Sequence, residues 1–207
     1  MALVLTILAV FLLLLVSEAW YRKRPKSGEL HRKFVHITVG SFVAFWPFFL
    51  SWNQIALLSA AFLAGVIASK YLKIFQAIHS VQRPTWGEVF FAAAVGIIAL
   101  VTHSKGIYAA ALLQMSLADG MAAVVGQRYG KGNRYKVFGS TKSVAGTMTF
   151  FVISFGLLIG YSLVTDAYLP LAFLAVLALG TSLIENLGVF GLDNLLVPLM
   201  IAYMLSL

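Results

Sequence analysis

The sequence alternates between long apolar runs and short polar breaks along its whole length. The apolar runs are about 17 to 22 residues long, which is the length that an α-helix needs to cross a bilayer. The pattern therefore predicts an all-α, polytopic transmembrane bundle, and we take residues 1–207 as one domain. Eight spans are expected, over residues 2–20, 34–50, 53–69, 88–103, 106–126, 143–164, 168–186 and 192–207.

Two segments leave alternatives open. Residues 192–207 would form a helix only about 24 Å long, interrupted by Pro198, so this span is predicted to be tilted, kinked or only partly inserted. In residues 70–83 apolar side chains recur at helical spacing. That spacing predicts either a helix lying in the headgroup layer or a simple extension of the third span.

Composition and charge predict that the chain lies in a membrane and which way it is oriented there. Of its residues 61% are hydrophobic and 11% charged, which excludes a soluble domain. The breaks at 21–33, 70–87 and 127–142 hold six, three and five of the fifteen Lys and Arg residues. Fourteen basic residues thus fall on one face, which the positive-inside rule makes cytoplasmic, with the N-terminus outside.

The charge and the ligand types limit the partners. The net charge is +8, and the basic residues lie beside the apolar runs and form no continuous stripe. This pattern favours anionic headgroups and phosphates over nucleic acid as binding partners. The chain has no cysteine and four histidines, so a bound metal is expected to be a hard, oxygen-liganded ion such as Mg²⁺.

Asp119 is the first candidate for chemistry, because it lies inside the fifth apolar run. A carboxylate at such a depth costs roughly 2.5 to 3.5 kcal/mol on insertion scales, so it usually has a function. The alternative is a structural ion pair with a neighbouring helix.

The other unusual polar residues fall on the same basic face. They are Arg32, Lys33 and His36 at the start of the second span, Glu88 at the start of the fourth, Lys142, Ser143 and Thr147 at the start of the sixth, Glu185 at the end of the seventh, and Asp193 and Asn194 at the start of the eighth. Taken singly, each has an ordinary structural explanation. Together, carboxylates from different helices facing several cations are what a magnesium nucleotide requires. The helix start at Thr141-Lys142-Ser143 also fits an anion site.

These residues form motifs that resemble the membrane family of polyprenol kinases, which includes phytol kinase, dolichol kinase and the CTP-dependent diacylglycerol kinase. The resemblance covers residues 29–200 in order, so the first span is peripheral to it. The motifs are Arg32-Lys33-x-x-His36-x-x-x-Gly40, Gly87-Glu88, Asp119-Gly120 with Gly126 and Gly130, Lys142-Ser143-x-x-Gly146-Thr147, and Glu185 with Gly191-x-Asp193-Asn194-x-x-x-Pro198.

The resemblance implies transfer of the terminal phosphate of CTP, or of another nucleoside triphosphate, to a lipid alcohol. It implies Mg²⁺ at Asp119, Asp193 and Glu185, with Asp119, Lys142, Glu88 and His36 as catalytic candidates. The general base stays open among Asp119, Glu88 and His36. Nucleotide contacts are expected from Arg32, Lys33, Gly120, Gly126, Arg128, Lys142, Ser143 and Asn194.

Three positions depart from the family's pattern. Ala118 replaces a glycine before the aspartate, Arg128 stands one place later than the family's arginine, and Val144 replaces a tryptophan. The acidic and basic groups are intact, so the departures bear on the choice of donor and on the size of the acceptor.

Other functions compete with the kinase. A CTP-dependent lipid cytidylyltransferase shares the aspartate and the lysine-containing helix start, but its carboxy-terminal signature is missing here. A small proton-coupled or cation-coupled transporter would place polar groups on both faces, and the outer face is nearly bare. A membrane scaffold would leave the clustered charges unexplained. The oligomeric state stays open.

Overall fold

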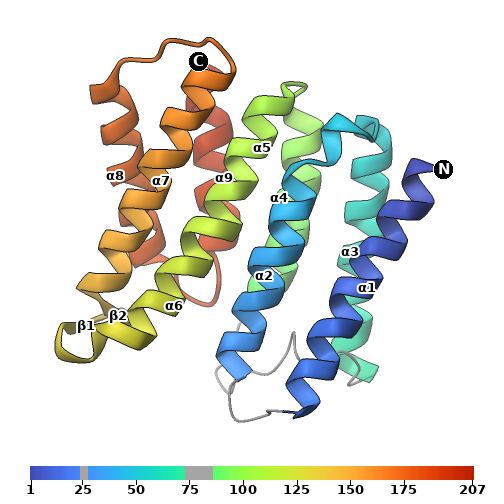
Figure 1. The fold of residues 1–207 in the computed structure, drawn as a ribbon, viewed down its shortest axis with the longest axis horizontal. Coiled ribbons are helices and arrows are strands. Elements are labelled where there is room, and N and C mark those ends of the chain that lie inside the picture. Colours follow the sequence, from blue (N-terminus) through green and yellow to red (C-terminus); the bar gives the residue numbers. More distant parts are fainter. Residues whose placement is uncertain (24–27, 73–85) are drawn as a thin grey trace.

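The structure is a computed structural model that describes residues 1–23, 28–72 and 86–207. It confirms the all-α bundle (Figure 1), with eight helical stretches in the described residues. They are α1 (Ala2–Lys23), α2 (Gly28–Ala44), α3 (Trp52–Leu72), α4 (Gly87–Val101), α5 (Lys105–Leu113) continuing into α6 (Asp119–Tyr129), α7 (Val144–Val164), α8 (Leu171–Leu187) and α9 (Asp193–Met204).

Four of these stretches are long and apolar enough to cross a membrane, namely Ala2–Lys23, Trp52–Ser69, Lys105–Gly132 and Val144–Val164. The chain is therefore an integral membrane protein. Both termini lie at one end of the bundle (Figure 1). A short hairpin after α6 lies at the opposite end, as expected for helices that alternate in direction.

Several helix ends differ from the predicted spans. Helix α2 begins at Gly28 and ends at Ala44, and a 3₁₀ turn η2 (Trp46–Phe48) follows, because Pro47 cannot donate to a continuing helix. Helix α9 contains Pro198 and covers about 18 Å, less than a bilayer core. The predicted helix over residues 70–83 falls mostly on residues 73–85, which lie outside the described residues.

A π-helical segment, η3 (Gln114–Ala118), joins α5 to α6. In it the Asp119 N–H bonds to the Gln114 carbonyl, five residues back instead of four. Such bulges are rare and frequent at functional sites. This one comes immediately before Asp119, so it sets the direction of the first residue of α6.

The break at 127–142 contains an antiparallel hairpin of β1 (Arg134–Val137) and β2 (Ser140–Ser143). Phe138 and Gly139 form its turn with φ of 46° and 81°. Two positive φ values are those of a type I′ turn, which matches the twist of the strands. Sequence analysis missed the hairpin because strands of four mostly polar residues carry no hydrophobic alternation.

Helices α6 and α7 cross closely because glycines face each other. A Cβ on Gly146 would lie 3.0 Å from the Ala122 carbonyl and 3.5 Å from the Gly126 Cα. Small residues at such crossings let helix backbones approach. The crossing brings Asp119, on α6, near the strand that carries Lys142.

Replacing Gly146 by valine should therefore push α6 and α7 apart. We expect Gly146→Val to destabilise the protein by about 1–3 kcal/mol, measured by thermal unfolding in detergent. Gly156→Val is the matched control, because a Cβ at Gly156 of the same helix meets nothing within 4 Å. Equal stability of the two variants would contradict the close crossing.

Candidate active site

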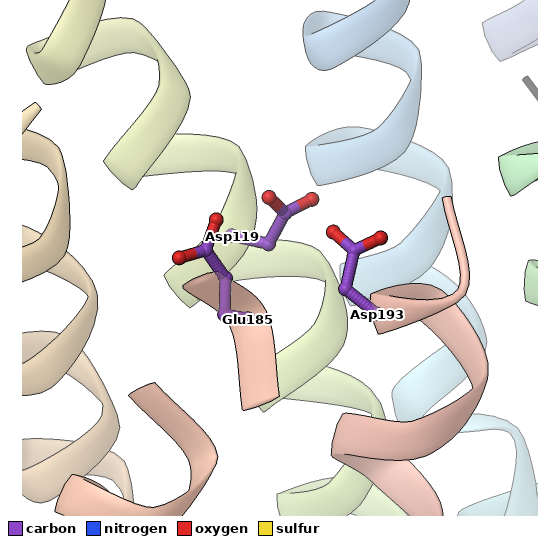
Figure 2. Close-up of side chains that lie close together, drawn as sticks. All are labelled: Asp119, Glu185 and Asp193. Atoms are coloured by element: carbon purple, nitrogen blue, oxygen red, sulfur yellow. The ribbon is translucent and has the colours of Figure 1, made fainter. Parts of the chain in front are cut away.

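Three carboxylates from three helices meet at the hairpin end of the bundle. Asp119 begins α6, Glu185 lies in the last turn of α8, and Asp193 begins α9. Figure 2 shows them side by side, and one oxygen from each lies within 4.8 Å of the others. The convergence expected from the predicted topology is therefore present.

Asp119 is buried and held by two residues of α2. Lys33 Nζ donates to Asp119 Oδ2 at 2.6 Å, and His36 Nε2 lies 3.3 Å from the same oxygen. His36 Nε2 is also 2.8 Å from the Met115 carbonyl in the π-helical segment. A carbonyl only accepts, so Nε2 carries a hydrogen and donates it.

Lys142 pairs with Glu185 across the cluster. Its ammonium donates to the Glu185 carboxylate, and to the Glu185 backbone carbonyl at 2.8 Å. Burial disfavours the charge on Lys142, but the Glu185 and Asp193 carboxylates outweigh it and raise the pKa of the ammonium above its ordinary value. Lys142 is therefore a fixed positive charge at neutral pH.

The hairpin is tied to the bundle, which fixes Lys142 in position. The Tyr135 hydroxyl on β1 donates to the Asn186 side-chain oxygen on α8 and hydrogen-bonds to Thr147 on α7. Ser143, at the end of β2, accepts from the Gly146 N–H at 3.1 Å and so caps α7. The predicted nucleotide contact Ser143 thus already has a structural role.

A cavity of about 660 Å³ opens beside the three acids, and we call it the main cavity. Most of the predicted site residues line it. These are Arg32, Lys33, Asp119, Gly126, Lys142, Ser143, Glu185, Asp193 and Asn194.

Four predicted site residues are not among those that line the main cavity. His36 and Glu88 line a smaller cavity next to it. Gly120 is buried, and a Cβ there would collide with the Ile37 side chain, so it serves close packing. Arg128 is exposed, and its guanidinium lies 5.4 Å from the centre of the Tyr129 ring.

Among the lining residues that the sequence analysis missed are Arg134, Phe138 and Phe190. Arg134 was counted only as one charge of a basic loop. Phe138 and Phe190 have positive φ, and each precedes a glycine with positive φ, Gly139 or Gly191. In the sequence, each Phe-Gly pair could have indicated a tight turn that exposes an aromatic side chain.

The donor set fits a hard divalent cation. Mg²⁺ takes oxygen ligands in an octahedron at about 2.1 Å and is usually held by one or two carboxylates, with waters or phosphates completing the shell. Asp119 pairs with Lys33 and Glu185 with Lys142. For Asp193, the described residues give no salt bridge within 4 Å, so its carboxylate is available to a cation.

A membrane helical bundle that places acids and lysines around one cavity has the charged groups that phosphate transfer requires. The chain is 34% identical over 193 residues to a phytol kinase from Synechocystis sp. (strain ATCC 27184 / PCC 6803 / Kazusa), covering 89% of this chain and 82% of the relative. It belongs to the polyprenol kinase family and is a kinase, a phosphotransferase. No family model matches the chain, and no solved structure does.

The buried pair of Lys33 and Asp119 predicts a strongly non-additive pair of substitutions. Lys33→Met leaves a buried carboxylate without its cation and should destabilise the protein by about 3–5 kcal/mol. Adding Asp119→Leu removes that carboxylate and should restore much of the stability, measured by unfolding in detergent.

The matched control is Lys105→Met, a lysine that is exposed in α5. It should leave the unfolding midpoint near that of the unmodified chain. A double variant as unstable as Lys33→Met alone would show that the two side chains do not act as a pair.

Proposed function

We propose that the protein transfers the terminal phosphate of CTP to the hydroxyl of a prenol-type lipid alcohol at the cytoplasmic membrane face. The observation that carries the proposal is the convergence of Asp119, Glu185 and Asp193 with Lys33 and Lys142 on one cavity. Phosphoryl transfer needs positioned partners and charge stabilisation more than covalent help from the protein, and these groups supply both.

Asp119 and Asp193 are the proposed magnesium ligands, with Glu185 as the third. Mg²⁺ held there would offset the negative charge of the nucleotide phosphates. Lys33 holds Asp119 in place, and Lys142 holds Glu185. Both lysines line the main cavity, where their positive charges would stabilise the phosphates. Arg134 and Arg32 add guanidinium groups suited to phosphate oxygens.

Two features of the main cavity support a nucleotide as the donor. Its volume of about 660 Å³ lies within the usual range for small-molecule sites, about 300–1,000 Å³. Phe138 and Phe190 line it, although they are 77% and 62% exposed, and both have positive φ. Bulky residues adopt that conformation at a cost, often at functional sites, and the two rings offer flat surfaces to a base.

The acceptor is proposed from the family and from the location of the site. The similar protein from Synechocystis sp. is named a phytol kinase, and phytol is a lipid alcohol. Glu185 and Asp193 lie at the helix ends that flank the loop between α8 and α9, and this loop is at the same end of the bundle as the basic hairpin (Figure 1). By the positive-inside rule this end would be cytoplasmic. A lipid alcohol could keep its chain in the bilayer and present its hydroxyl at this level.

The reaction balances without a further reactant. The alcohol oxygen forms a bond to the terminal phosphorus, the bond from that phosphorus to the bridging oxygen breaks, and the nucleoside diphosphate leaves. The hydroxyl proton passes to a base. A cytidylyltransferase would instead form its bond at the α-phosphorus and release diphosphate.

The position of the label separates these reactions. Purified protein in detergent, given phytol, Mg²⁺ and CTP labelled on the γ-phosphate, should yield labelled phytyl phosphate. CTP labelled on the α-phosphate should yield no labelled lipid. Asp119→Asn should lower turnover at least about 100-fold, because it removes a ligand charge from the cluster.

With phosphatidate supplied beside phytol, lipid label from the α-phosphate would identify a cytidylyltransferase, and no labelled lipid from either nucleotide would exclude both reactions. Glu18→Gln is the matched control for Asp119→Asn, because Glu18 lies in α1 and pairs with Arg22 outside the main cavity. It should retain normal turnover.

A further inference from the structure

A second cavity of about 40 Å³ adjoins the main cavity, and we call it the side cavity. Arg32 and Asn194 line both, so the two spaces share a wall. The side cavity lies among α2, α3, α4 and the start of α9.

The walls of the side cavity are mainly apolar. Val35, Val39, Phe62 and Phe91 line it, and the Phe91 ring lies edge-on to Phe62, with centroids 6.2 Å apart. A water needs roughly 10–15 Å³ of such space, so about 40 Å³ holds a hydroxyl with a carbon or two. A phosphate or a nucleobase is too large for it.

Two buried hydrogen-bond acceptors belong to residues that line this cavity. Glu88 Oε1 and Asn194 Oδ1 have no hydrogen-bond partner among the described residues. Asn194 is only 4% exposed, and its Nδ2 donates to the Gly87 carbonyl at 3.0 Å, which leaves Oδ1 as the free end of the amide. Buried acceptors cost free energy unless a donor reaches them, and an alcohol hydroxyl is a donor.

The other two candidates for the general base each already have a hydrogen-bond partner. His36 Nε2 donates to the Met115 carbonyl, and Asp119 is paired with Lys33 and belongs to the acid cluster. Glu88 is a carboxylate in the first turn of α4 with one buried oxygen that lacks a donor.

We propose that the side cavity binds the hydroxyl end of the lipid alcohol, which donates its one hydrogen bond to Glu88, the general base, beside Asn194 in the shared wall. The proposal rests on the kinase reaction described above. The alcohol oxygen forms its bond to the terminal phosphorus of the nucleotide at the place where the side cavity adjoins the main cavity. Its proton goes to the Glu88 carboxylate as the nucleoside diphosphate leaves.

Kinetics on two variants test this assignment with phytol and CTP. Glu88→Gln keeps the shape and one hydrogen-bond acceptor but takes up no proton, so kcat should fall about 100-fold with KM for CTP unchanged. Val35→Phe fills the cavity and should raise KM for phytol about tenfold or more, again without changing KM for CTP. Val101→Phe, at an exposed position of α4, is the control and should leave all constants unchanged.

Stability gives a readout that separates a site from a structural role. Glu88 Oε1 makes no hydrogen bond in the described residues, so Glu88→Leu should lower activity without lowering the thermal midpoint in detergent. A lower midpoint, normal kcat in Glu88→Gln, or a raised KM for CTP in Val35→Phe would overturn the assignment. If the unmodified protein phosphorylates no alcohol, the proposed kinase function fails instead.

Discussion

The fold depends on the neutralisation of one carboxylate that an apolar helix carries into the bundle. Asp119 is buried, and its cost is offset by Lys33 at 2.6 Å and by His36 at 3.3 Å, both from α2. The π-helical segment before Asp119 supplies the carbonyl to which His36 donates. These contacts join α2 to α6, whose residues are far apart in the sequence.

The rest of the main cavity is built outward from this pair. The glycine crossing of α6 and α7 brings the hairpin close, and Tyr135 ties the hairpin to α7 and α8. Lys142 can then reach Glu185 from the far side of the cluster. The result is three acids and two lysines that line one large cavity, with a small, mainly apolar cavity next to it.

Much of this could be predicted from the sequence. The helices and their order follow from the apolar runs, and the basic breaks assign the polar residues to one end, so the meeting of Asp119, Lys142 and Asp193 could be expected. The hairpin, the π-helical segment and the side cavity could not, because they depend on tertiary contacts. Arg134 lies in β1 and lines the cavity, while Arg128 lies in α6 against Tyr129, and loop composition does not encode this difference.

The central claim is that three acids from three helices form one cation site. Titration with Mn²⁺, followed by electron paramagnetic resonance, tests it on the unmodified protein and on Asp119→Asn, Glu185→Gln and Asp193→Asn. The account predicts one site whose affinity falls about tenfold or more in each variant, since each removes a carboxylate ligand. Mn²⁺ binding of equal affinity in the unmodified protein and all three variants would contradict it.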